Sequence, residues 1–315
     1  MIIAVASGKG GTGKTTVAVS LALSIPGTVT LLDCDVEEPN AGIFLKVDNS
    51  KEQPITVPVP SIDTSRCTVC GKCARFCEFN AIVCIGTAAM VFPELCHSCG
   101  GCIRICPQKA MTETPVAIGT LTEATATREN SDTRSAKSSE SPPIHFVQGL
   151  LSTGNALTPP VIRAVRARGK QMRGKDSQGE AVTIIDSPPG TSCPMTTAVR
   201  GTDFVLLVTE PTPFGLHDLK LAVETVRKMR LPFGVVLNRA DSGDNRVTEF
   251  CKREGIEILL QIPEDRRIAE AYSSGHALVN AFPEYGERFR HLYEAVIFRK
   301  DHALASIEQK AENCE

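Results

Sequence analysis

The sequence predicts an α/β protein with a mainly parallel sheet that is interrupted by a cysteine-rich insert, and three observations lead to this prediction. Short apolar runs that end in polar or Pro/Gly turns alternate with helical stretches, which is typical of a doubly wound sheet with helices on both faces. A glycine-rich turn joins the first apolar run to the first helical stretch. Two runs of four cysteines follow the second apolar run, and their spacing is typical of metal ligands.

The apolar runs and their turns locate the main elements. Each run is short and ends in acids, glycine or proline, as buried parallel strands do. Strands are expected within residues 1–6, 27–35, 181–190, 202–211, 231–241 and 256–265, and helices within 14–25 and 215–230.

The cysteine-rich block divides the chain into two domains. Residues 1–60 and 116–315 carry the alternating pattern and are assigned to the α/β domain, and residues 61–115 are assigned to the insert. The insert contains an internal repeat with an offset of 29 residues, from Cys67 to Cys96. Residues 120–143 are rich in Ser, Thr and charge with few large apolar side chains, which predicts a flexible loop.

Composition excludes several classes of partner. A formal net charge of -2 provides no overall basic field for nucleic acid or an acidic membrane. No stretch reaches the roughly 18 to 20 apolar residues of a membrane span, and no charged region precedes the short N-terminal apolar run. Thirteen cysteines would be unusual as disulfides in a reducing compartment. We therefore expect a cytoplasmic protein that binds metal, with no membrane and no nucleic acid among its partners.

The segment "GKGGTGKTT" meets the requirements of a phosphate-binding loop because it lies between an expected strand and an expected helix. Its backbone N–H groups and the helix N-terminus can surround phosphate oxygens, Lys14 neutralises charge, and the Thr15 hydroxyl can bind Mg²⁺. Lys9 is a second lysine that the loop itself does not need. The nucleotide-binding residues expected here are Gly8, Lys9, Gly10, Gly11, Thr12, Gly13, Lys14, Thr15 and Thr16.

Together with later segments, this loop resembles the deviant P-loop ATPases of the MinD/ParA class. Those segments are "DCD" at 33–35, "DSPPG" at 186–190, and "VLNRAD" and "IPED" near the C-terminus. The resemblance implies Mg²⁺-dependent hydrolysis of ATP to ADP and phosphate. It also implies a nucleotide-dependent dimer in which Lys9 reaches the partner's nucleotide. Lys9, Lys14 and Asp35 are the catalytic residues that it implies.

The resemblance further assigns roles to single residues. Asp35 would orient the attacking water or a water on Mg²⁺, and Asp186 would hold the Mg²⁺ shell through water. Gly190 would offer its N–H to the γ-phosphate, so that the segment around it responds to the presence of that phosphate. Asn238 would bind the adenine edge, with Pro263 packed nearby.

The two cysteine runs share the spacing C-x2-C-x2-C-x3-C, and the second ends in Cys-Pro. They resemble the runs of bacterial two-cluster ferredoxins, in which the fourth cysteine of each run serves the other cluster. Zinc is the alternative, since C-x2-C pairs also suit tetrahedral zinc. Glu78 stands where the first run ordinarily has proline. The ligands implied for two [4Fe–4S] clusters are Cys67, Cys70, Cys73 and Cys106 for the first and Cys96, Cys99, Cys102 and Cys77 for the second.

The other cysteines are expected to have different roles. Cys34, Cys84 and Cys251 are interpreted as small packed thiols, and Cys314 lies in the C-terminal tail. Cys193 follows the predicted γ-phosphate segment, where the related nitrogenase iron protein uses a cysteine to hold a cluster between subunits. The second cysteine of that site has no clear counterpart in this sequence, so the role of Cys193 stays open.

The combination resembles MinD-superfamily ATPases that carry an inserted ferredoxin domain, including members of orange-protein systems. Three functions are compatible with it. The first is ATP-controlled electron transfer or partner docking in a metalloenzyme or metal-cofactor system, the second an ATP-dependent carrier or assembly factor for metal or iron–sulfur clusters, and the third a positioning ATPase. The expected partners are a second copy or a paralogous ATPase, and a redox or metal-cofactor protein.

Overall fold

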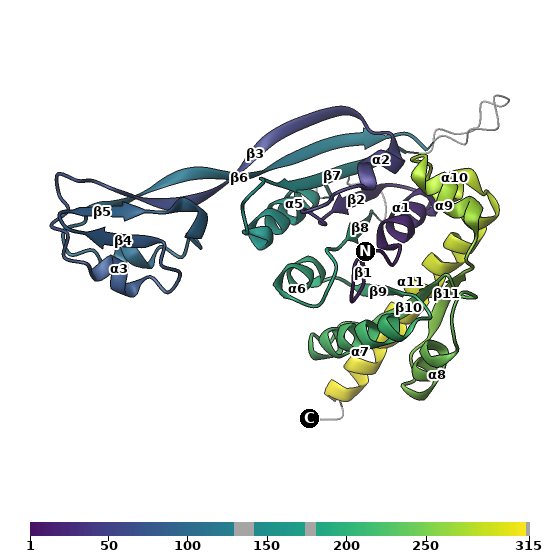
Figure 1. Cartoon of the computed structure of the whole chain (residues 1–315). Helices are drawn as coiled ribbons and strands as arrows, with labels where there is room; N and C mark the ends of the chain where they lie inside the picture. Colours follow the sequence, from purple (N-terminus) through teal and green to yellow (C-terminus); the bar gives the residue numbers. More distant parts are fainter. Residues whose placement is uncertain (129–141, 174–180, 313–315) are drawn as a thin grey trace.

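The computed structural model describes residues 1–128, 142–173 and 181–312, and within them nine strands form one sheet in the order β11-β10-β9-β1-β8-β2-β7-β6-β3. The strands from β11 to β7 run parallel, and β6 and β3 are antiparallel additions at one edge (Figure 1). The predicted mainly parallel α/β sheet is therefore confirmed. The strands are β1 (Ile2–Ala6), β2 (Val29–Asp33), β3 (Asp48–Ile62), β6 (Met111–Ala126), β7 (Ile144–Leu151), β8 (Val182–Asp186), β9 (Phe204–Thr209), β10 (Phe233–Asn238) and β11 (Ile258–Ile262).

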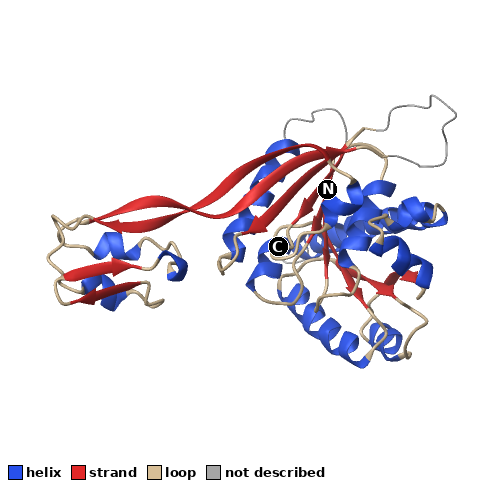
Figure 2. Cartoon of the chain, turned by 45° about the horizontal axis from the view of Figure 1, so that its top comes forward, coloured by secondary structure: helices blue, strands red, loops and turns tan. Residues whose placement is uncertain are grey.

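Helices cover both faces of this sheet (Figure 2). Helix α7 shows why they do so, because its buried residues Leu219, Ala222, Val223 and Val226 recur at the spacing of one helical face. One apolar cluster joins the sheet to α5, α6, α7 and α8, and a second joins it to α1, α2, α10 and α11. The helices are α1 (Lys14–Ser24), α2 (Ala41–Leu45), α5 (Thr158–Arg173), α6 (Cys193–Val199), α7 (Pro213–Lys228), α8 (Arg246–Arg253), α9 (Arg266–Ser273), α10 (Leu278–Ala281) and α11 (Glu284–Glu312).

The strands β3 and β6 form a long two-stranded ribbon that carries the insert away from the sheet (Figure 1). In β3, Ile55, Val57 and Val59 are buried and alternate with exposed residues, as the period of a strand requires. The prolines of β3, at positions 54, 58 and 60, are tolerated because β3 is the edge strand. Proline on an edge also opposes pairing with another chain.

Part of the predicted flexible loop at 120–143 is wrong. Thr120 to Ala126 belong to β6, where they pair with residues 144–150 of β7. Leu121, Ala124 and Ala126 are buried there, so three apolar side chains in a Thr-rich segment suffice when a neighbouring strand supplies the hydrogen bonds. Residues 129–141 of the predicted loop lie outside the described residues.

The ribbon leaves the sheet at the edge where the parallel strands end. Strand β6 pairs with β7 only from Gly119 onward, so residues 111–118 extend past Leu151, the end of β7. Because β7 is parallel to β2, that end lies at the same edge as Asp33. This is the edge at which open α/β sheets bind ligands.

The cysteine module, residues 63–110, lies at the far end of the ribbon (Figure 1). It consists of two short helices, one 3-10 turn and a two-stranded sheet. The expected insert limits of 61 and 115 fall inside the ribbon, because β3 continues to Ile62 and β6 begins at Met111. The elements are α3 (Lys72–Phe76), β4 (Ile82–Ile85), β5 (Ala88–Val91), the turn η1 (Pro93–Leu95) and α4 (Gly101–Ile105).

Candidate functional site

The glycine-rich loop between β1 and α1 has the tight backbone that its sequence predicts. Gly13 immediately precedes α1 with φ of 92°, a conformation that glycine adopts without strain. A Cβ at Gly13 would lie 2.5 Å from the Asn238 amide nitrogen, and one at Gly8 would lie 2.2 Å from the Asp218 carbonyl oxygen on α7. The loop is therefore packed between the end of β10 and the N-terminal half of α7, where only glycine fits.

A cleft of about 1040 Å³ opens beside this loop, large enough for a nucleotide by the usual size of ligand pockets. The predicted residues that line it include Lys14, Thr15, Asp35, Asn238 and Pro263. Several other lining residues were not predicted as site residues, because those in the loop after Asp35 and on α9 belong to no motif and those in "IPED" were quoted only as part of a segment. They are Glu37, Glu38, Asn40, Glu264, Asp265, Arg266 and Tyr272.

Three acids lie at neighbouring strand ends beside Lys14, and burial affects each of them. Burial raises the pKa of Asp35 to about 6 although Lys14, with its Nζ 3.9 Å from an Asp35 oxygen, lowers it. Burial also raises the pKa of Asp33, and its charged neighbour Asp186 raises it further. The Asp33 carboxylate accepts backbone N–H bonds from Asp35, Asn40 and Ala41, so it shapes the loop before α2 rather than facing the cleft.

As far as the structure describes the chain, the Asp186 carboxylate lacks the partners that a buried acid requires. It is fully buried, and burial raises its pKa to about 6, with Lys14 and the nearby Thr15 hydroxyl acting in the opposite direction. Within the part of the chain that the structure describes, neither carboxylate oxygen has a hydrogen-bond partner of good geometry, and the same holds for the Thr12 hydroxyl. Buried polar atoms without partners are costly. These residues fit a Mg²⁺ ion with its water shell.

Two predicted contacts to nucleotide are occupied by protein atoms. The Gly190 N–H donates to the Ser7 carbonyl at 3.0 Å, so that hydrogen bond must break before Gly190 can bind a γ-phosphate. The Asn238 amide donates to the Thr12 carbonyl at 2.9 Å, and its oxygen accepts from the Arg239 N–H. Asn238 thereby braces the glycine-rich loop and keeps one N–H and one lone pair for a base.

Lys9 points away from its own cleft toward an acid that the sequence analysis missed. Its Nζ lies 3.4 Å from Glu210, and Arg239 holds the other Glu210 oxygen at 2.9 Å. Glu210 is 6 % exposed and directly follows β9. A polar residue at the end of an apolar strand run was the available signal, but its partners depend on the tertiary structure.

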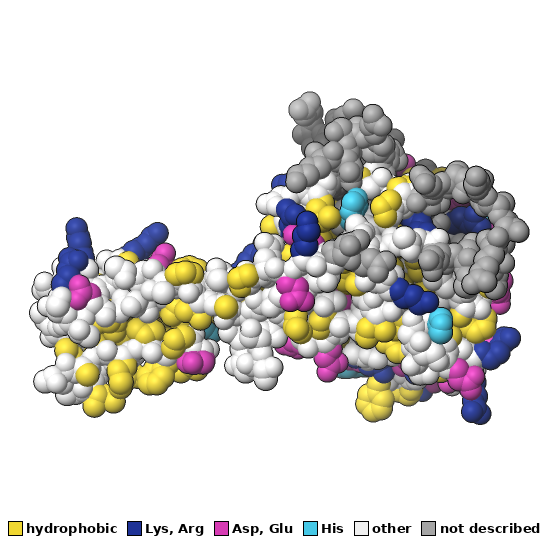
Figure 3. All heavy atoms as spheres, turned by 90° about the horizontal axis from the view of Figure 1, so that it is seen from above, with side chains coloured by type: hydrophobic (Ala, Val, Ile, Leu, Met, Phe, Trp, Pro, Cys, Tyr) yellow, Lys and Arg dark blue, Asp and Glu magenta, His cyan; other side chains and the backbone are white. Residues whose placement is uncertain are grey.

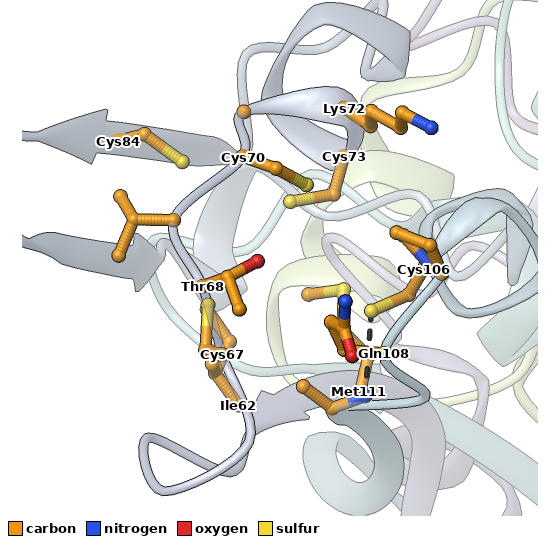
Figure 4. A pocket seen from close by; sticks show the side chains of 14 residues that line it. Ile62, Cys67, Thr68, Cys70, Lys72, Cys73, Cys84, Cys106, Gln108 and Met111 are labelled. Atoms are coloured by element: carbon orange, nitrogen blue, oxygen red, sulfur yellow. Dashed lines mark hydrogen bonds between the residues drawn. The ribbon is translucent and has the colours of Figure 1, made fainter.

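The cysteines of the two runs surround two separate pockets. One pocket is lined by Cys67, Cys70, Cys73 and Cys106 (Figure 4), and the other by Cys77, Cys96, Cys99 and Cys102. Each grouping takes three cysteines from one run and the fourth from the other, as the resemblance implied. Among the described residues, no three His, Cys, Asp or Glu side chains meet in a group that could hold a metal ion. The cluster sites remain a prediction from the sequence.

The backbone of the cysteine module repeats with the same offset of 29 residues as its sequence. Three pairs have positive φ, namely Val69 and Ser98, Gly71 and Gly100, and Asn80 and Lys109. A β-branched residue such as Val69 rarely adopts this conformation. Two sulfurs also accept backbone N–H bonds, Cys96 from Ser98 at 3.4 Å and Cys106 from Ala110 at 3.3 Å. Strained loops whose N–H groups face sulfur fit iron–sulfur ligation, because such bonds tune cluster potentials.

The remaining thiols separate into two groups. Cys34 and Cys251 are buried in the apolar cluster, as expected for packed thiols. Cys193 is exposed at the start of α6. The interpretation of Cys84 as a packed thiol needs correction, because Cys84 lines the first cysteine pocket. Burial raises the pKa of Cys73 and the Cys84 thiol raises it further, so these two sulfurs are near each other.

One apolar cluster connects the two sites. It includes Val36, next to Asp35, continues through Ile55, Val57 and Val59 of the ribbon, and reaches Cys96. The loop after Asp35 is also tied to the end of β7 by the Leu151 N–H bond to the Val36 carbonyl. A displacement of this loop can therefore reach the ribbon through packed side chains.

Two exclusions from the sequence can be compared with the described residues. None of the described helices has the length and apolarity that crossing a membrane requires. The sequence is locally basic at 163–173, "RAVRARGKQMR", and this stretch lies on α5, where Arg166 donates to the carbonyls of Thr197 and Arg200 and Arg168 pairs with Glu123. The side chains of both arginines therefore form contacts within the protein.

Comparison with known proteins identifies the family to which the α/β domain is similar. The model of the CobQ/CobB/MinD/ParA nucleotide binding domain matches residues 3–279. An uncharacterized protein of Methanocaldococcus jannaschii is 27% identical over 89% of this chain and 91% of its own. An iron-sulfur cluster carrier protein of Pyrococcus horikoshii is 26% identical over 88% and 78%. The septum site-determining protein MinD with Mg-ADP, also from Pyrococcus horikoshii, has a TM-score of 0.51 and 20% identity over 94% and 95%.

Proposed function

Because the chain belongs to the CobQ/CobB/MinD/ParA family of nucleotide-binding domains, we propose that it is an ATP-hydrolysing iron–sulfur protein. In this proposal the nucleotide state controls how the cysteine module exchanges electrons with a partner. The observation that carries the proposal is the continuous apolar cluster from Val36, beside the nucleotide cleft, to Cys96 in the module.

Different residues of the chain contact the phosphates, the Mg²⁺ ion and the attacking water in this proposal. The glycine-rich loop and Lys14 bind the phosphates. The Thr15 hydroxyl would hold Mg²⁺ and Asp186 would hold its water shell, and the ion would supply positive charge to the transferred phosphoryl group. Asp35, with its pKa raised to about 6, is charged at neutral pH and orients water in the cleft. Gly190 exchanges its bond to Ser7 for one to the γ-phosphate, which moves the segment before α6.

The second lysine completes the site in a dimer. Lys9 cannot serve its own nucleotide while it faces Glu210, and its side chain is one-third exposed. The large apolar side chain of Phe214, at the start of α7, is 77% exposed on the helix that packs against Gly8. We infer that two copies, or this chain and a paralogue, meet through this face when ATP is bound.

The cysteine module provides the partner surface. The two cysteine pockets would hold [4Fe–4S] clusters, which supply one-electron chemistry when bound. Large apolar side chains are exposed along the module (Figure 3), and such patches are typical of interaction sites. They are Phe76, Phe79, Ile85, Met90, Phe92, Leu95 and Ile105. A partner that covers them would approach both clusters.

Redox titration of anaerobically purified protein tests the proposal. The midpoint potentials of both clusters, followed by EPR, are measured without nucleotide, with ADP, and with a non-hydrolysable ATP analogue. We expect at least one potential to shift with the analogue in the wild type and none to shift in Lys14→Ala. Potentials that ignore nucleotide, together with an unchanged rate of electron transfer to an external acceptor, would overturn the coupling.

A cluster carrier is the second candidate, and two observations favour it. The relative from Pyrococcus horikoshii with that name aligns with most of this chain, and Cys70 and Cys99 are exposed, so one corner of each cluster would face solvent. Incubation with an apo-ferredoxin distinguishes the two candidates. Loss of iron to the acceptor, faster with ATP, supports a carrier, and reduction of a holo-acceptor without loss of iron supports electron transfer.

A further inference from the structure

The first cysteine pocket contains five thiols, one more than a [4Fe–4S] cluster requires. Besides the four predicted ligands, Cys84 lines the pocket from β4. Its sulfur is directed toward the side of the pocket where Cys70 and Cys73 lie (Figure 4). Cys84 is half-buried and forms no disulfide, so its thiol is available on the inner wall of this pocket.

The second pocket differs at the equivalent position. The offset of 29 residues that relates Cys67 to Cys96, and Gly71 to Gly100, relates Cys84 to Glu113. The structure agrees, since Gly71 and Cys84 line the first pocket together and a Glu113 oxygen lies 3.7 Å from where a Gly100 Cβ would be. The two halves of the module therefore offer different side chains beside otherwise matching cysteine runs.

We propose that Cys84 is a fifth thiol ligand for the first pocket's cluster and can replace Cys70. This inference rests on the proposed presence of clusters. Cys70 is the exchangeable ligand because it is exposed, whereas Cys67, Cys73 and Cys106 are half-buried. In the exchange the Cys84 thiol releases its proton to solvent as its sulfur–iron bond forms. The Cys70 sulfur–iron bond breaks and the Cys70 thiolate takes up a proton, with no electron transferred.

The exchange makes the two clusters unequal. With Cys84 bound, the exposed Cys70 thiol is released at the surface of the module, where it can engage a partner while the cluster stays complete. The residue at the equivalent position beside the second pocket is Glu113, and four cysteines line that pocket, so the described part of the chain offers the second cluster no fifth thiol nearby. Ligand exchange is therefore restricted to the first pocket.

Paired alanine variants test the proposal, because Cys99 occupies in the second run the place of Cys70 in the first. Protein is reconstituted anaerobically, and iron and acid-labile sulfide are measured together with EPR spectra of oxidised and dithionite-reduced samples. Cys70→Ala should keep about eight irons for two [4Fe–4S] clusters, with an altered spectrum of one cluster in the reduced protein. Cys99→Ala should lose iron and show the signal of a three-iron cluster when oxidised.

The double variant and the single Cys84→Ala variant complete the experiment. Cys84→Ala should keep about eight irons, and Cys70→Ala/Cys84→Ala should behave like Cys99→Ala. The inference is overturned if Cys70→Ala loses as much iron as the double variant, or if Cys84→Ala alone loses a cluster. Wild-type protein that binds no iron would instead refute the proposed function, so the two failures are distinguishable.

Discussion

Replacing Glu210 by glutamine should strengthen the ATP-dependent dimer, because Lys9 must leave Glu210 before it can reach a partner's nucleotide. The ion pair spans 3.4 Å, with side-chain exposures of 33% for Lys9 and 9% for Glu210. At an effective dielectric constant of about 20, the Coulomb attraction alone is about 5 kcal/mol. Desolvation and side-chain entropy reduce the net value of partly exposed pairs to about 1 kcal/mol.

Each dimer breaks two such pairs, one in each protomer. Removing both should lower the cost of dimerisation by about 2 kcal/mol, which corresponds to a dimer dissociation constant lower by a factor of about 30. Glutamine keeps the size of the side chain and an oxygen that Arg239 can use. The dissociation constant is measured by sedimentation with a non-hydrolysable ATP analogue and with ADP, and only the analogue form should respond.

The Lys9→Ala background is the matched control for this prediction. If Glu210 acts by retaining Lys9, Glu210→Gln should have no effect on dimerisation once Lys9 is absent. Higher salt should also narrow the difference between wild type and Glu210→Gln, because exposed charges are screened. The reasoning is refuted if Glu210→Gln tightens the dimer equally in both backgrounds, or leaves the wild-type dimer unchanged.

Three further predictions follow from the buried contacts. The pKa of Asp186 is raised to about 6, so its buried carboxyl is neutral and costs no stability below about pH 4, and it destabilises the fold as pH rises through about 6. In calorimetry without nucleotide, the Tm of Asp186→Asn should therefore be roughly 5 °C above that of the wild type at pH 7.5, and the difference should be smaller at pH 5. Asn238→Ala removes a bond to the Thr12 carbonyl worth about 1 kcal/mol and should weaken ATP binding about fivefold in titration calorimetry, and unchanged affinity would contradict its bracing role. Val57→Ala removes buried contacts in the ribbon worth about 2 kcal/mol. It should reduce the nucleotide-induced shift in cluster potential without changing the iron content, whereas the exposed control Thr56→Ala should leave that shift unchanged.

Much of the nucleotide site could be predicted because its information is local. A glycine-rich turn before a helix specifies a backbone that holds phosphate, and Lys14, Thr15 and Asp35 line the observed cleft as expected. The partners of Lys9 could not be predicted, because Lys9 follows β1 whereas Glu210 and Arg239 follow β9 and β10, which come much later in the sequence. Their meeting is a consequence of the order in which the strands pair.

Spacing along the chain is enough to predict the alternating elements, the glycine-rich loop and the two runs of four cysteines, because each is a local pattern. The pairing of β3 with β6 in one ribbon, the place of Cys84 beside the first pocket and the apolar cluster that includes Val36 and Cys96 emerged from the fold. Strand pairing and side-chain packing bring together residues whose separation in the sequence carries no periodic signal, so these contacts could not be predicted.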